Sequence, residues 1–150
     1  MFYSIFTEMK KVILSFLVTA FLSVTAFAGN DPQITSTPDA GCNSSSTLAV
    51  KLSCQVYSTY DLKTPLTNAL RENQFKLVME SKAQYLVEFC YTPVPKAKIG
   101  GVNYDIKNFT ATVSNVETGE SVLTVSIKDV KKEAEITEAL VKAMKNVFSK

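Results

Sequence analysis

The sequence predicts an α+β fold: a two-layer sandwich in which two helices cover one face of a mostly antiparallel sheet, in the order β-α-β-β-β-α. Three observations predict this fold. Apolar residues alternate in several segments, two other segments carry apolar residues at helical spacing, and the later strands follow one another through short connections. In such a sandwich the helices bury one face of the sheet, and we expect the other face to be more polar.

The first two elements are a strand and a helix. Residues 48–57 alternate apolar and polar side chains, which predicts a strand with one buried face that includes Cys54. Residues 61–74 predict a short amphipathic helix, in which Thr64 can act as the N-cap and Pro65 can take the first helical position. Because this helix separates two strands, the connection through it is expected to be a crossover.

The middle of the chain is rich in aromatic and β-branched residues. Residues 75–79 predict a short extended piece and residues 83–92 a strand, whose alternation places Tyr85, Val87, Phe89 and Tyr91 on one face. Two prolines and a pair of glycines then interrupt the pattern. Residues 93–101 are therefore predicted to form a loop, which carries Lys96 and Lys98.

The last three elements are two strands and a helix. Residues 104–116 and 121–127 predict antiparallel strands joined by a tight turn, in which Gly119 can adopt a positive φ. The apolar residues before and after Lys107-Asn108 are out of phase, which predicts a β-bulge there. Residues 133–148 place a stripe of apolar side chains on one helical face and predict the closing helix.

Residues 9–29 have the pattern of a secretory signal peptide. Two lysines precede an apolar run that is shorter than a membrane-spanning helix requires, and Ala26-Phe27-Ala28 matches a cleavage site. We expect residues 1–28 to be removed, with translation starting at Met1 or at Met9. Gly29 follows the cleavage site directly, whereas a lipoprotein would carry a cysteine at that position. We therefore do not expect a lipoprotein. The expected product is periplasmic or secreted, without stable membrane insertion after cleavage.

Composition divides the rest of the chain in two. Residues 29–47 consist mainly of small and polar residues, so we expect a flexible polar leader. Residues 48–150 are expected to form a single α+β domain with one core. Removing residues 1–28 takes away two of 16 basic and one of 14 acidic residues, leaving a net charge of +1. This balance favours neither nucleic acid nor an anionic membrane as partner.

The sequence contains no histidine, the commonest general base and zinc ligand. Its carboxylates are expected at turns and on polar helix faces, where they are solvated. Neither phosphate-binding loops nor the spacing of metal ligands occurs. We therefore expect no catalytic residues, no metal, no cofactor and no enzymatic activity.

The three cysteines of an exported chain allow at most one internal disulfide. Strand alternation predicts that Cys54 and Cys90 point to opposite faces of the sheet, which disfavours a bond between them. The preferred pair is therefore Cys42 with Cys90. Two alternatives remain open: Cys54 and Cys90 as small core residues with Cys42 free, or an intermolecular bond through Cys42.

Candidate binding residues are tyrosines of the sheet and lysines of the proline-glycine segment. Tyrosine combines an apolar ring with a polar tip and is enriched in recognition surfaces. An alternative is that the tyrosines pack within the sheet and the lysines are merely solvated. The candidates are Tyr57, Tyr91, Lys96, Lys98 and Tyr104.

Several motifs resemble those of a known group of proteins. These are L-T-N-A-L-R-E-N-Q-F at residues 66–75, A-Q-Y-L-V at residues 83–87 and E-T-G-E-S-V-L at residues 117–123, behind a signal peptide. Together they resemble small bacterial envelope proteins of the CsgG, penicillin-binding-protein-activator and TolB amino-terminal-domain type. The resemblance implies the same α+β fold and a role in the cell envelope.

Two functional hypotheses follow. The first is a non-enzymatic interaction module that docks to another envelope protein through a sheet edge or the polar sheet face. The second is a carrier of small apolar ligands, which requires a cavity between sheet and helices.

Overall fold

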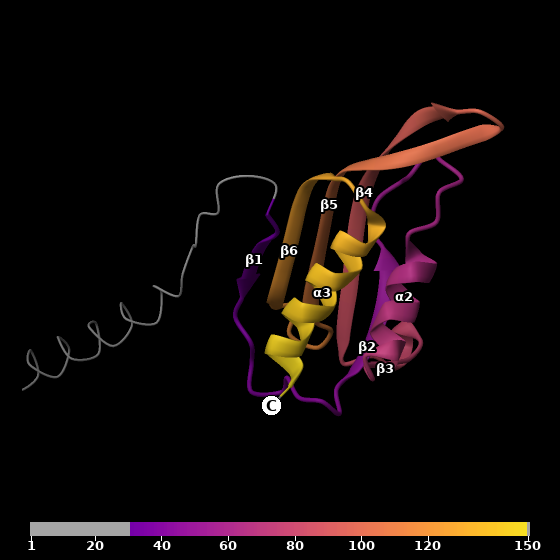
Figure 1. Ribbon diagram of the computed structural model, residues 1–150. Helices are drawn as coiled ribbons and strands as arrows, with labels where there is room; N and C mark the ends of the chain where they lie inside the picture. The colour runs from indigo at the N-terminus through magenta and orange to yellow at the C-terminus, as the bar shows by residue number, and fades with distance from the viewer. Residues whose placement is uncertain (1–30, 150) are drawn as a thin grey trace, which may run out of the picture.

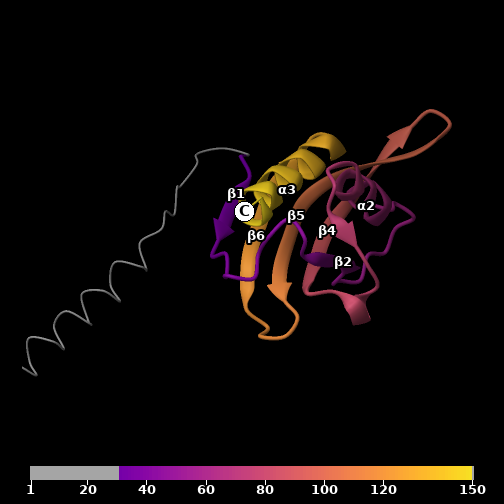
Figure 2. The ribbon, with the colours of Figure 1, turned by 90° about the horizontal axis from the view of Figure 1, so that it is seen from below.

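The computed structural model describes residues 31–149 of the chain. They form one six-stranded sheet with the order β1-β6-β5-β4-β2-β3 and two longer helices on the same side of it (Figures 1 and 2). The elements are β1 (Gln33–Ser36), β2 (Thr47–Leu52), α2 (Lys63–Glu72), β3 (Lys76–Leu77), the 3₁₀ helix η1 (Glu80–Lys82), β4 (Tyr85–Lys98), β5 (Gly101–Asn115), β6 (Ser121–Val130) and α3 (Glu133–Phe148). This architecture confirms the predicted α+β sandwich. The region predicted as a cleaved signal peptide lies outside the described residues.

The sheet is mixed. Strands β1, β6, β5 and β4 pair antiparallel with one another, whereas β2 runs parallel to both β4 and β3. The parallel pair β2–β3 is joined through α2, as a connection between parallel neighbours requires.

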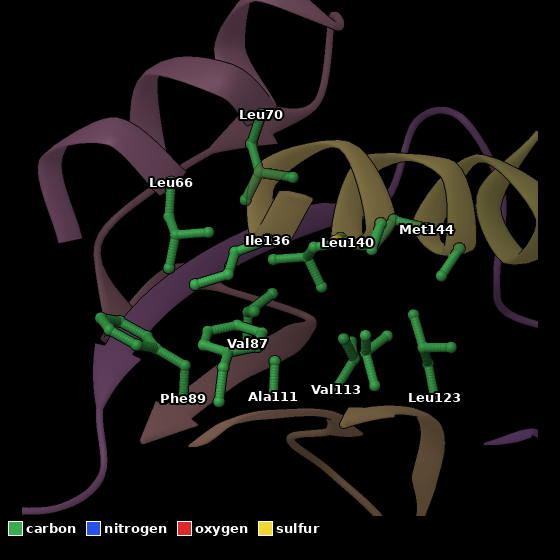
Figure 3. Packing of buried hydrophobic residues seen from close by; sticks show 14 of the residues in the cluster. Leu66, Leu70, Val87, Phe89, Ala111, Val113, Leu123, Ile136, Leu140 and Met144 are labelled. Carbon is green, nitrogen blue, oxygen red and sulfur yellow. The ribbon is translucent and has the colours of Figure 1, made fainter. Parts of the chain in front are cut away.

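The core lies between the sheet and the two helices. Alternate side chains of β4, β5 and β6 point towards the apolar stripes of α2 and α3, as the close-up in Figure 3 shows. The residues labelled there are Leu66, Leu70, Val87, Phe89, Ala111, Val113, Leu123, Ile136, Leu140 and Met144. All ten are buried, so the apolar faces of the helices and the sheet supply the main stabilisation of the fold.

The β-bulge lies where the sequence predicts it. Thr92 pairs with Asn108 and Pro93 pairs with Ile106, so Lys107 has no partner in β4. The extra residue restores the phase of the apolar residues on either side of it. Ile106 and Phe109 are consequently both buried on the helix side of the sheet.

The segment from Pro93 to Gly101 is not the loop that the sequence predicts. Strand β4 continues to Lys98 and β5 begins at Gly101, with a tight turn at residues 99 and 100. Pro93 and Pro95 are tolerated because β2 ends opposite Phe89, so that within the described part of the chain this stretch of β4 has a strand partner on one side only. A proline in an edge strand can direct its nitrogen away from the ladder.

The predicted flexible leader is also partly ordered. Residues 33–36 form β1 at the edge of the sheet, although all four side chains are exposed. Its order therefore comes from backbone pairing with β6 rather than from apolar burial, and composition does not reveal such pairing. Further along the same leader, Cys42 is buried.

Candidate functional site

A long two-stranded arm, residues 93–106 of β4 and β5, extends from one end of the sheet beyond both helices (Figure 1). Its exposed apolar side chains are Val94, Ile99 and Val102, of which Ile99 at the tip is fully exposed. Lys96 forms an ion pair with Asp105 across the two strands. Lys98 is exposed beside the turn. The arm thus presents apolar and cationic side chains away from the core.

The base of this arm is held by Tyr60, from the segment between β2 and α2. Its ring contacts the ring of Tyr91 edge-on at 6.0 Å and the ring of Tyr104 at 5.9 Å. The Tyr91 hydroxyl donates a 2.6 Å hydrogen bond to the Tyr60 carbonyl oxygen, and the Tyr60 hydroxyl donates to Glu133 of α3. The pKa of Tyr60 is raised mainly by burial and, to a smaller extent, by this bond to a carboxylate. These contacts connect the arm to the helical layer.

The structure separates the five predicted binding residues. Tyr57 is 86% exposed between β2 and α2, and Lys96 and Lys98 lie on the arm. Tyr91 is only 6% exposed, and burial raises its pKa. Its ring is part of the core, which fits the alternative interpretation that this tyrosine packs within the sheet. Tyr104 is half-buried at the arm base.

The disulfide joins Cys54 to Cys90, with Cα atoms 5.4 Å apart. The predicted pairing of Cys42 with Cys90 is thus corrected. The error arose because β2 ends at Leu52, so strand alternation no longer determines where Cys54 points. Ser53 still donates its backbone N–H to the Phe89 carbonyl at 2.8 Å, which brings the next residue close to β4.

Cys42 is a free thiol within a polar network next to the core. Asp39 accepts hydrogen bonds from the Tyr85 hydroxyl at 2.6 Å and from the Asn115 amide at 3.0 Å, and also from the backbone N–H groups of Gly41 and Cys42. These donors lower the pKa of Asp39 to about 2. Burial raises the pKa of the Cys42 thiol, so its environment favours the inert thiol over the reactive thiolate.

The face of the sheet opposite the helices is polar, as predicted. Its hydroxyl side chains stand on four neighbouring strands, and the hydroxyl oxygens of Thr110 and Ser126 lie 3.4 Å apart. They are Thr35, Thr92, Thr110, Thr112, Ser114, Thr124 and Ser126. This face is a second surface available for contact.

A surface groove of about 530 Å³ lies between α2 and the β2–β3 edge of the sheet; we call it the α2 groove. Lys63, Thr67 and Arg71 of α2 line one side, four residues apart and therefore on one face of the helix. The remaining lining residues are Ala49, Val50, Leu77, Val78, Met79 and Glu80. The helical spacing of Lys63 and Arg71 in the sequence is enough to predict that both cations lie on one face of α2. The sequence does not indicate that this face lies next to a sheet edge.

Two further properties of the described residues concern metal-ligand clusters and membrane-spanning helices. Residues 31–149 bring no three potential metal-ligating side chains together. No helix among residues 31–149 combines the length and the apolar character needed to cross a bilayer.

Comparison with known proteins identifies the fold. No protein-family model matches the chain, and no curated protein matches it by sequence. Among solved structures, a dodecameric PelC variant from Paraburkholderia phytofirmans is similar to it with a TM-score of 0.52 and 14% identity, over 79% of this chain and 98% of PelC. A second crystal form of the PelC dodecamer gives a TM-score of 0.51 and 13% identity, over 79% of this chain and 99% of PelC.

A weaker similarity connects the chain to part of a longer protein. A PDZ domain protein from Parabacteroides distasonis has a TM-score of 0.46 and 12% identity, over 79% of this chain and 36% of that protein. The PelC structures show that this chain shares their α+β fold. The more specific resemblance to CsgG, penicillin-binding-protein-activator and TolB domains stays a prediction.

Proposed function

We propose that this chain is an exported, non-enzymatic interaction module that docks to another cell-envelope protein, and that the arm is its contact element. The observation that carries the proposal is the projection of the arm, with Val94, Ile99 and Val102 exposed along it. Large apolar side chains exposed on a protruding element provide apolar area that a bound partner can cover.

The attachment of the arm supports this function. Tyr60 contacts Tyr91 and Tyr104 at the arm base and connects them to Glu133 of α3. An arm that is held in position before binding loses less conformational entropy when a partner is bound.

The core supports docking over carriage of an apolar ligand. A carrier needs its cavity between sheet and helices. That space is filled by interlocking side chains of both layers, among them Phe89, Ile136 and Leu140 (Figure 3).

The partner to which the arm docks can be a different envelope protein or a second copy of the chain. PelC, whose structures are described as dodecamers, shows that this fold is compatible with self-assembly. Lys98, which lies near the arm tip beyond the Lys96–Asp105 ion pair, favours a partner surface with exposed carboxylates.

Site-specific photocrosslinking in the native cells tests the proposal. A photoreactive amino acid replaces Ile99 at the arm tip in the full chain, and in a control it replaces Glu117, which is exposed at the opposite end of the sheet. We expect a discrete crosslinked product from position 99 and none from position 117. Mass spectrometry of the product then distinguishes an envelope protein from a second copy.

The same preparation tests export. The mature N-terminus is expected at Gly29 in protein from the periplasmic or secreted fraction. Equal crosslinking at both positions, or an intact leader on protein in the cytosol, would contradict the proposed function.

A further inference from the structure

We propose that the α2 groove binds an extended, acidic segment of a partner protein, which adds to the free edge of β2 as an extra strand. The inference goes beyond the function proposed above, because it concerns another surface, a backbone-directed mode of binding and a defined partner chemistry. It rests on three independent features of the groove within residues 31–149: an unpaired strand edge, exposed apolar side chains, and two cationic side chains without an ion pair.

The first feature is the outer edge of β2. Its pairing with β3 stops at Leu48, while the strand itself continues to Leu52. In a parallel ladder alternate residues direct their N–H and C=O groups to the same side. Since Ser53 N–H is bonded to Phe89 of β4, the groups of Val50 and Leu52 point away from β4.

These outward groups have no partner within the described chain. Outside the regular strands and helices, no backbone hydrogen bond among residues 31–149 involves Val50 or Leu52. An extended peptide can pair with such an edge and obtain main-chain hydrogen bonds, as in strand addition to other sheets.

The second feature is apolar. Along β2, exposure increases towards the end of the strand: Leu48 is fully buried, Val50 is half-buried and Leu52 is 36% exposed. Met79, on the other side of the groove, is 67% exposed. An added strand would cover these side chains and remove apolar surface from water.

The third feature is the charge on α2. Lys63 and Arg71 are exposed and neither forms an ion pair within residues 31–149. The one carboxylate lining the groove, Glu80, is paired with Lys51 at 2.8 Å. The groove is therefore positively charged, which selects an acidic occupant. The arm of a second copy, with Lys96 and Lys98, has the wrong sign.

The spacing of the cations suggests a sequence pattern for the occupant. Eight residues of helix separate Lys63 from Arg71, a rise of about 12 Å. In an extended strand, side chains on one face that are four residues apart are separated by about 13 Å. The expected occupant therefore carries two acidic residues four positions apart, with an apolar residue midway between them on the face that covers Val50 and Leu52.

Fluorescence anisotropy with the purified full chain tests the charge requirement. The probe is a labelled eight-residue peptide with glutamates at its second and sixth positions, valines at the fourth and eighth, and threonines at the others. We expect Lys63→Glu and Arg71→Glu each to weaken binding about tenfold, the effect of one charge-assisted pair. Replacing both glutamates of the peptide by glutamines should weaken it at least as much.

Lys142→Glu, an exposed charge reversal on α3 away from the groove, is the matched control and should leave binding unchanged. Equal weakening by this control would show that only net charge matters and would overturn the proposal. Absence of binding to the unmodified chain would overturn it as well.

The strand pairing has its own test. Leu52→Pro removes an outward N–H without removing a ladder bond to β4, whereas Leu52→Thr keeps that N–H. We expect the proline variant to lose peptide binding and the threonine variant to retain most of it. In the unmodified chain, the peptide should slow hydrogen exchange at the amides of Val50 and Leu52; protection elsewhere would overturn the assignment.

These outcomes are separable from those for the arm. The peptide assay uses purified protein and groove variants, while the crosslinking experiment reports contacts at Ile99 in cells. Failure of one therefore leaves the other result standing.

Discussion

The hydroxyl of Tyr85 donates a 2.6 Å hydrogen bond to Oδ1 of Asp39 and so joins β4 to the segment that follows β1. The other carboxylate oxygen of Asp39 accepts from the Asn115 amide at the end of β5. One side chain of the predicted leader thereby contacts two central strands. This contact explains how a segment poor in apolar residues is fixed against the domain.

The Asp39 network predicts a dependence of stability on pH. Because hydrogen bonds lower the pKa of Asp39 to about 2 from the ordinary 3.8, the ionised form is favoured in the folded state. Its stabilisation is fully present above about pH 4 and is lost as the pH falls towards 2. Urea unfolding at a series of pH values is expected to show this decrease.

Asp39→Asn should flatten the acid part of the profile of unfolding free energy against pH. It should also lower stability near neutral pH by about 1–3 kcal/mol, because the groups that donate hydrogen bonds to Asp39 would be poorly satisfied. Asp31→Asn, an exposed change in the same segment, serves as the control and should retain the slope. An identical profile for Asp39→Asn would contradict the role assigned to this carboxylate.

The disulfide predicts a second measurable effect. Since Cys54 and Cys90 are 36 residues apart, replacing both by serine should lower stability by about 4 kcal/mol through the entropy of the unfolded chain. Peptide mapping without reductant should recover these two cysteines in one linked pair.

The free thiol of Cys42 gives a complementary test of the disulfide assignment. Its side chain is 5% exposed, so a thiol reagent should label it only after unfolding. Cys42→Ala is expected to leave the disulfide intact. Rapid labelling of Cys42 in the folded protein, or its recovery in a mixed disulfide, would contradict this arrangement.

Local signals in the sequence predicted those features that depend on neighbouring residues. The apolar stripe of α3, the positive φ of Gly119 and the bulge at Lys107 all follow from short-range patterns, and the structure has each of them. The α2 helix begins at Lys63 rather than at Pro65, because Asp61 accepts hydrogen bonds from the backbone N–H groups of Lys63 and Thr64.

Features that depend on distant partners were not predictable in this way. Strand β1 exists because β6 offers it an edge, and the direction of Cys54 depends on where β2 stops pairing. Likewise, the α2 groove depends on β3 being only two residues long. To predict any of these three features one must know which strands are neighbours in the sheet. The alternation of residues within a single strand does not give that information.

The turn between β5 and β6 gives a third prediction. Gly119 has a φ of +73°, and its position would leave an added Cβ in open space. Gly119→Ala should therefore lower stability by about 1 kcal/mol through backbone strain alone. Gly101→Ala, which also meets no neighbour but has no positive φ, should change stability much less. Thermal unfolding of the two variants side by side measures the difference.

The Tyr91 hydroxyl gives the last prediction. Tyr91→Phe keeps the buried ring but removes the hydrogen bond to the Tyr60 carbonyl, and should cost about 1 kcal/mol. Because this bond holds the segment before α2 against the arm base, hydrogen exchange should accelerate at Tyr60 and along residues 93–106. Tyr57→Phe, on an exposed ring, should change neither quantity. Unaltered exchange in the Tyr91→Phe variant would show that ring packing alone positions the arm.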